Sequence, residues 1–115
     1  MIVEDNPKVR RLIRYAINEI CDAVIECTDG AEALEAYTIH RPDLVLMDVQ
    51  MPRLDGLLAT KILKEHYPDA KIHILSDYDE DEMRFAAAVA GASSYTSKAH
   101  IDELDSIVEQ YSRNG

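Results

Sequence analysis

Short apolar segments alternate with amphipathic segments of helical spacing along this chain of 115 residues. The strand-like segments are expected at residues 1–3, 22–27, 44–47, 71–75 and 93–96. The helical segments follow at residues 7–20, 31–40, 56–66, 79–90 and 101–111. Short strands that alternate with helices of about ten to fourteen residues indicate a parallel sheet with helices on both faces. The sequence therefore predicts an α/β fold with a doubly wound five-stranded parallel sheet, of strand order 2-1-3-4-5.

Capping and breaking residues mark the helix boundaries. Asn6 is expected to cap the first helix, with Pro7 at its first position. Asp79 or Asp81 can cap the fourth helix, and Gly91 is expected to end it. The first strand is short for a central strand of such a sheet, so we expect that a few residues upstream of it are missing.

Composition and charge limit the classes of function. The length fits a single domain, which we assign to residues 1–115. Lys and Arg number 12 against 22 Asp and Glu, and the net charge of −10 argues against direct nucleic-acid binding by this domain. No stretch approaches about 18 apolar residues, so we expect a cytoplasmic protein without a membrane partner. Cys21 and Cys27 form no C-x-x-C pair and are expected to be free thiols.

Asp48 directly follows the apolar run of the third strand, where a buried carboxylate is costly unless another group pairs with it. Glu4 and Asp5 follow the first strand, Ser76 closes the fourth and Lys98 follows the fifth. Because the carboxyl ends of parallel strands share one edge of the sheet, we expect these side chains to meet there. Neighbouring carboxylates suit a hard divalent cation, whereas a hydroxyl and an ammonium suit phosphoryl oxygens. The pattern predicts phosphorylation of Asp48.

Four stretches of the sequence, at residues 4–6, 45–56, 74–76 and 91–98, carry a family resemblance. With their acidic pair, an aspartate in an M-D-x-x-M-P-x-x-D-G setting, a serine and a lysine in this order, the chain resembles the receiver domain of two-component response regulators over essentially its whole length. The resemblance implies a (βα)5 flavodoxin-like fold. It also implies that the chain is a phosphoacceptor switch and not an enzyme. Such a switch catalyses at most its own phosphoryl transfer and dephosphorylation.

The resemblance assigns roles to individual residues. Asp48 would accept the phosphoryl group, and Asp5 and Asp48 would coordinate Mg²⁺ together with the backbone carbonyl of Gln50. Glu4 would bind the ion through water, which agrees with the tendency of Mg²⁺ to keep several waters.

The remaining site residues would read and stabilise the phosphorylated state. Lys98 would pair with Asp48 before transfer and with a phosphoryl oxygen afterwards, and Ser76 would hydrogen-bond another oxygen. Tyr95 would be the switch aromatic, whose movement alters the surface made by the fourth helix, the fifth strand and the fifth helix.

The implied partners are a sensor histidine kinase and an output domain. Receivers with helix-turn-helix, DNA-binding output domains often have a G-A-x-x-Y-x-x-K stretch like residues 91–98, followed by a residue other than proline, here Ala99. We therefore expect a transcription-regulating effector outside this chain, and a homodimer can form on phosphorylation. The alternatives are a stand-alone receiver and a degenerate receiver that binds partners without phosphorylation.

Two residues depart from the family pattern. Asp77 replaces a small residue and would slow phosphorylation if it faces incoming anions. Otherwise it points to solvent or joins Asp79 in favouring the positive end of the fourth helix. Ala99 stands where many receivers have a proline after a cis peptide bond, so Lys98 is expected in a different loop geometry.

Three other functional readings are disfavoured by the residues. Haloacid-dehalogenase-type phosphatases use D-x-D, but the second acid is replaced here by Gln50, which cannot transfer a proton. The glycines form neither G-x-G-x-x-G nor a P-loop. The histidines show no metal-ligand spacing, and surface or capping roles are expected for all four of them, at positions 40, 66, 73 and 100.

Overall fold

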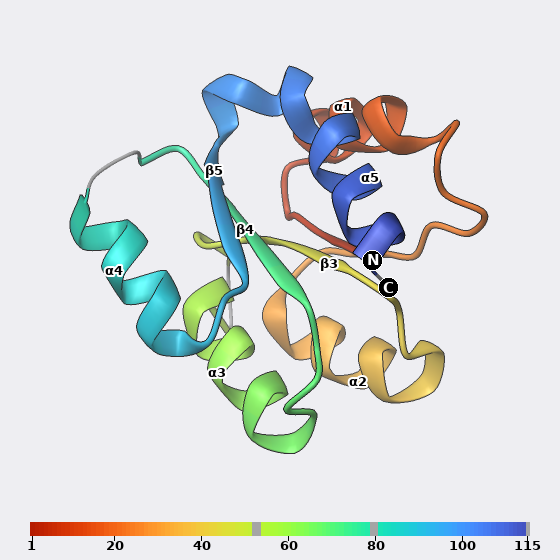
Figure 1. The fold of residues 1–115 in the computed structure, drawn as a ribbon. Helices are drawn as coiled ribbons and strands as arrows, with labels where there is room; N and C mark the ends of the chain where they lie inside the picture. Colours follow the sequence, from red (N-terminus) through yellow and green to blue (C-terminus); the bar gives the residue numbers. More distant parts are fainter. Residues whose placement is uncertain (52–53, 79–80, 115) are drawn as a thin grey trace.

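The computed structural model describes residues 1–51, 54–78 and 81–114. Its parallel sheet has the strand order β2-β1-β3-β4-β5 (Figure 1), which confirms the predicted α/β doubly wound fold. The strands are β1 (Ile2–Val3), β2 (Glu26–Cys27), β3 (Val45–Asp48), β4 (Ile72–Ser76) and β5 (Ser94–Ser97). The helices are α1 (Pro7–Ile17), α2 (Gly30–His40), α3 (Gly56–His66), α4 (Asp81–Ala90) and α5 (Leu104–Asn114), with a 3₁₀ segment η1 (Lys98–Glu103) before α5. None of the described helices is long and apolar enough to cross a membrane.

The sheet separates two apolar cores, because successive side chains of a strand point to opposite faces. Val45 and Met47 of β3 pack into the core that α2, α3 and α4 cover, whereas Leu46 packs into the core under α1 and α5. Figure 1 shows the same division, with α1 and α5 together on one side of the sheet. All four residues of β3 are buried, as expected for a central strand covered on both faces.

Several predicted element boundaries are wrong, most clearly at the first helix, the second strand and the last helix, which was expected at residues 101–111 whereas α5 is Leu104–Asn114. The first helix was expected to reach residue 20, but α1 ends at Ile17 and the chain continues in a turn closed by the bond from Ile20 N to the Ile17 carbonyl, 3.1 Å. Ile20 still packs on the core under α1, so the apolar periodicity outlasts the helix. The second strand was expected at residues 22–27, but β2 pairs only with the equally short β1 and comprises two residues.

Asn6 and Gly91 act at the helix ends as the sequence indicates. The Asn6 side chain accepts from the backbone N–H of Lys8 at 2.9 Å, and Pro7 occupies the first position of α1. Gly91 follows α4 with a φ of 104°, a left-handed conformation that ends the helix. Of the two proposed caps of α4, Asp79 lies outside the described residues, and the prediction for Asp81 is wrong because Asp81 is the first residue of the helix. Both thiols are free, as expected.

His73 corrects a prediction. A surface or capping role was expected, but its side chain is buried in β4, with Nδ1 2.5 Å from Ser94 Oγ. Ser94 Oγ also hydrogen-bonds the Tyr111 hydroxyl on α5, so the three residues connect β4, β5 and α5. Burial lowers the pKa of His73 to about 4. The buried imidazole is therefore neutral at pH 7.

Candidate functional site

The carboxyl ends of β1, β3, β4 and β5 place the predicted site residues at one edge of the sheet. Asp48 is the last residue of β3 and is only 4 % exposed. In the parallel register it lies beside Leu75 of β4. Gly56 approaches it so closely that a Cβ added there would lie 1.8 Å from the Asp48 carbonyl oxygen. The first residue of α3 therefore packs directly against the backbone of Asp48.

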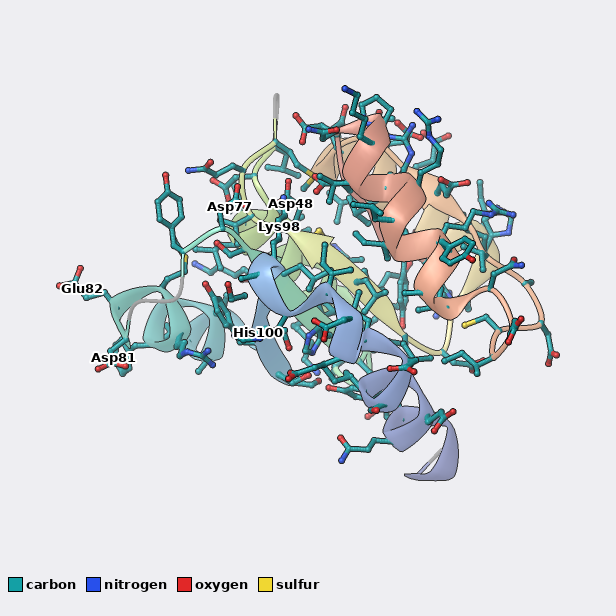
Figure 2. All side chains as sticks on the ribbon, turned by 90° about the horizontal axis from the view of Figure 1, so that it is seen from above. Asp48, Asp77, Asp81, Glu82, Lys98 and His100 are labelled. Carbon is teal, nitrogen blue, oxygen red and sulfur yellow. The ribbon has the colours of Figure 1, made fainter. Side chains whose placement is uncertain are left out.

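The Lys98 ammonium lies between two buried carboxylates. Its Nζ is 2.9 Å from Asp48 Oδ1 and 2.7 Å from Glu4 Oε1, and the Lys98 side chain is 13 % exposed. Burial lowers the pKa of Lys98, but its hydrogen bonds to Glu4 and Asp48 outweigh burial and leave the pKa above its ordinary value. Lys98 is therefore a permanent cation at neutral pH, and Figure 2 shows it beside Asp48.

Glu4 is the most deeply buried acid of the site, and its residue is fully inaccessible. Its burial, together with the neighbouring Asp48, raises its pKa to about 7, although Lys98 acts in the opposite direction. Its Oε2 atom has no hydrogen-bond partner among the described residues. Among the described residues, one ammonium thus serves two buried carboxylates, which leaves them short of positive charge whenever both are ionised.

Asp5 completes an acidic cluster at the surface. Its carboxylate is exposed, and Glu4, Asp5 and Asp48 each offer an oxygen within 4.8 Å of the others. Carboxylate oxygens are the ligands that Mg²⁺ prefers, and the unpartnered Glu4 oxygen indicates a need for further positive charge. The donor set present in the chain therefore fits a divalent cation.

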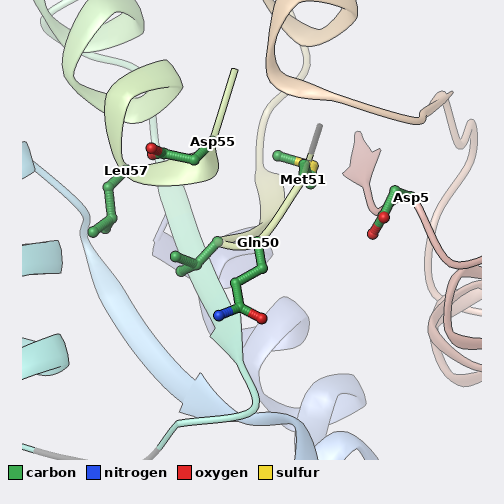
Figure 3. A pocket seen from close by; sticks show the side chains of 6 residues that line it. Asp5, Gln50, Met51, Asp55 and Leu57 are labelled. Carbon is green, nitrogen blue, oxygen red and sulfur yellow. The ribbon is translucent and has the colours of Figure 1, made fainter. Parts of the chain in front are cut away.

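A cavity of about 510 Å³ opens beside this cluster. In Figure 3, Asp5 lies on one side of the loop after β3, with Asp55 and Leu57 on the other side. The Gln50 side chain is exposed between them and donates from Nε2 to the Tyr78 hydroxyl at 3.0 Å. The loops that follow β3 and β4 are thus joined across the mouth of the site.

Ser76 and Tyr95 are both connected to the loop after β4. Ser76 ends β4, is buried, and accepts at Oγ from the backbone N–H of Tyr78, 3.1 Å away. The Tyr95 hydroxyl, on β5, donates to the backbone carbonyl of Tyr78. The guanidinium of Arg84 on α4 stacks over the Tyr95 ring at 4.8 Å. The predicted switch residues therefore converge on Tyr78, which nothing in the sequence pattern singled out.

The two departures from the expected pattern have plain structural settings. Asp77 is exposed, and Figure 2 shows Asp81 and Glu82 at the start of α4, away from Asp48. The acids at the start of α4 are therefore separate from the acidic cluster. The described residues contain no cis peptide bond, so the bond between Lys98 and Ala99 is trans. In this loop, Ser97 Oγ accepts a hydrogen bond from the backbone N–H of Ala99 at 3.2 Å.

Comparisons with known proteins agree with this arrangement. The model of the response regulator receiver domain matches residues 1–109. The uncharacterized transcriptional regulatory protein YxjL of Bacillus subtilis is 38 % identical over 104 residues, which cover 89 % of this chain and 48 % of that protein. The chemotaxis protein CheY of Halobacterium salinarum is 36 % identical, over 85 % of this chain and 82 % of CheY. The chain spans about half the length of the regulatory proteins YxjL, YhcZ and NreC that it matches.

Solved structures show the same fold. A LuxR-family two-component response regulator from Aurantimonas superposes with a TM-score of 0.89 at 33 % identity, over 96 % of this chain and 81 % of that one. The receiver domain of the Francisella response regulator 1452 gives a TM-score of 0.90 at 29 % identity, over 99 % of this chain and 96 % of that domain. The relatives thus include transcription regulators and a receiver similar in length to this chain.

Proposed function

Because this chain belongs to the response regulator receiver domain family, we propose that it is a phosphorylation-controlled switch in which Asp48 accepts a phosphoryl group. The observation that carries the proposal is the Lys98 ammonium, which lies 2.9 Å from Asp48 and 2.7 Å from the buried Glu4. The Lys98 ammonium, held beside the Asp48 carboxylate, is already placed to pair with an oxygen of a phosphoryl group that approaches Asp48.

The transfer itself is a simple displacement. A carboxylate oxygen of Asp48 forms a bond to phosphorus while the bond from phosphorus to the histidine nitrogen of a partner kinase breaks, and that imidazole takes up a proton from water. Asp5, Asp48 and the Gln50 carbonyl would hold Mg²⁺, with Glu4 acting through water. When bound, the ion neutralises the carboxylates and the phosphoryl oxygens that approach one another.

After transfer, the side chains around Asp48 would change partners. Lys98 would move from the carboxylate to a phosphoryl oxygen. The Ser76 hydroxyl, which accepts from the Tyr78 N–H, would turn to donate its proton to another such oxygen. The Tyr95 hydroxyl is hydrogen-bonded to the carbonyl of the same Tyr78. A displacement of the loop after β4 would therefore move Tyr95 and alter the surface formed by α4, β5 and α5. That surface would control a transcription-regulating output domain or a homodimer in the cytoplasm.

Intact mass spectrometry tests the proposal. The chain is treated with acetyl phosphate, with and without Mg²⁺, beside Asp48→Ala and the control Asp77→Asn, which removes an exposed acid near the site. We expect a Mg²⁺-dependent gain of about 80 Da, the mass of one added phosphoryl group, in the wild type and Asp77→Asn, and none in Asp48→Ala. A folded wild type that gains no mass would overturn the proposal in favour of a receiver that binds partners without phosphorylation. Faster modification of Asp77→Asn would show that Asp77 repels incoming anions.

A further inference from the structure

Arg10 connects α1 to the ends of two strands. Its Nη1 donates to the backbone carbonyl of Glu4 at 2.9 Å, and its Nε lies 3.2 Å from Glu26 Oε1 on β2. The side chain is only 21 % exposed. A guanidinium can hold both groups at once because its N–H donors form a planar fork.

The Glu4 backbone is consequently held on both sides. Its N–H donates to the Cys27 carbonyl at 3.0 Å, and its carbonyl accepts from Arg10. The Glu4 carbonyl belongs to the peptide group that joins Glu4 to Asp5. Because a peptide group is planar, fixing its carbonyl fixes the direction in which the chain enters Asp5.

Asp5 depends on this backbone for its position. Only residues 4–6 connect β1 to α1, and Asn6 is fixed by its capping bonds at the start of the helix. Within the part of the chain that the structure describes, no side chain pairs with the exposed Asp5 carboxylate. The geometry of its backbone therefore sets the point from which that carboxylate can reach toward Asp48.

We propose that Arg10 is a positioning residue for the acidic cluster: by holding the Glu4 carbonyl, it presents the Asp5 carboxylate to a divalent cation. The inference rests on the proposed function, since it concerns the same Mg²⁺ site. The change in Mg²⁺ affinity on replacing Arg10 would have the opposite sign if Arg10 acted only through its charge. Removing a positive charge near a cation site would strengthen cation binding by Coulomb's law, whereas loss of positioning weakens it.

Arg14 supplies a matched control. Its Nη1 also pairs with Glu26, and the structure gives it no contact with the Glu4 carbonyl within the described residues. Arg14→Gln thus removes the same charge from the same helix and the same acidic partner. Arg10→Lys keeps the charge but loses the fork that reaches both groups.

Isothermal titration with MgCl₂ measures the effect in the wild type, Arg10→Gln, Arg10→Lys and Arg14→Gln, with folding checked by circular dichroism and urea unfolding. We expect Mg²⁺ to bind about tenfold more weakly to both Arg10 variants, as is typical when a group that orients a metal ligand is lost. Arg14→Gln should bind within about twofold of the wild type. If Arg10→Gln fails to fold, the Mg²⁺ affinity of Arg10→Lys is compared with that of the wild type instead.

The outcomes distinguish a failure of the Arg10 role from a failure of the proposed function. Unchanged or tighter Mg²⁺ binding in the Arg10 variants would overturn the role of Arg10 alone. Equal weakening in Arg14→Gln would also overturn it, since the loss would then follow from the shared ion pair with Glu26. A folded wild type that binds no Mg²⁺ would count against the metal-dependent switch itself.

Discussion

The sheet contains two sets of buried polar side chains with opposite electrostatic character. At its carboxyl edge, Glu4, Asp48 and Lys98 bury charges, and the pKa of Glu4 is raised to about 7. Nearer the middle of β4, His73 is equally buried, but it is neutral, hydrogen-bonded to Ser94, and has its pKa lowered to about 4. Burial acts on both groups by disfavouring the charged form.

The difference shows how burial of polarity relates to function. The His73 imidazole is tolerated in the apolar core because it stays uncharged, and its hydrogen bond to Ser94 connects β4 to β5. The carboxylates share a single ammonium, and one oxygen of Glu4 has no partner among the described residues. His73 Nε2 also lacks a partner among the described residues, so the two sets differ in charge and not in how fully they are hydrogen-bonded. The neutral set needs no counter-ion, whereas the charged set is receptive to an added cation.

Lys98→Met gives the largest expected effect and tests the charged set directly. The substitution leaves Glu4 and Asp48 buried without their cation, so we expect a loss of about 3–5 kcal/mol in the free energy of unfolding at pH 8 without Mg²⁺. Urea unfolding measures it. Adding Glu4→Gln to Lys98→Met should recover part of the loss. A loss below about 1 kcal/mol at pH 8 would contradict the view that Lys98 compensates buried charge.

The pH dependence of stability should have opposite signs in the two sets. The pKa of Glu4 rises on folding from 4.5 to about 7, so its contribution is complete below the unfolded value and is lost as pH rises to 7. This loss is of the order of 3 kcal/mol. Unfolding in urea between pH 4.5 and 7.5, without Mg²⁺, should show the decline in the wild type relative to Glu4→Gln. If the two proteins give parallel curves, Glu4 is not protonated in this range.

His73→Leu gives the smallest effect near neutral pH. The pKa of His73 falls on folding from 6.5 to about 4, so its neutral form favours the folded state above pH 6.5 and stability is lost as pH falls toward 4. Replacing it with leucine should remove that acid-side loss while changing stability by only about 1 kcal/mol at pH 7.5. Urea unfolding at pH 5 and 7.5 checks both values. A loss above about 3 kcal/mol at pH 7.5 would mean that the connection from His73 through Ser94 to Tyr111 stabilises the fold far more than we infer.

The sequence predicted the fold and the meeting of the strand ends well, because both follow from periodicity and from the parallel arrangement. Asp48 and Lys98 lie together for that reason. The second ion pair of Lys98, to Glu4, was not predicted because it depends on side-chain reach. The contact of Arg10 with the Glu4 carbonyl was missed because a backbone acceptor leaves no pattern in the sequence.

His73 shows where reasoning by residue type fails. A histidine is common at surfaces, and that expectation outweighed its position between Ile72 and Ile74 in a central apolar strand. The alternation along β4 places it on the same face as Leu75, under α1 and α5. Position in the strand decided its burial, and the hydroxyl of Ser94 on the neighbouring strand made that burial possible.

The close approach of Gly56 to the Asp48 backbone has a consequence for redesign and for divergence of this pocket. Since a methyl group at residue 56 would collide with the Asp48 carbonyl, every sequence that keeps this geometry must keep a hydrogen there. Met51 and Leu57 line the cavity, and each already carries a side chain there. Side chains of other shapes can therefore be tried at these two positions, whereas the contact between α3 and β3 at Gly56 requires glycine.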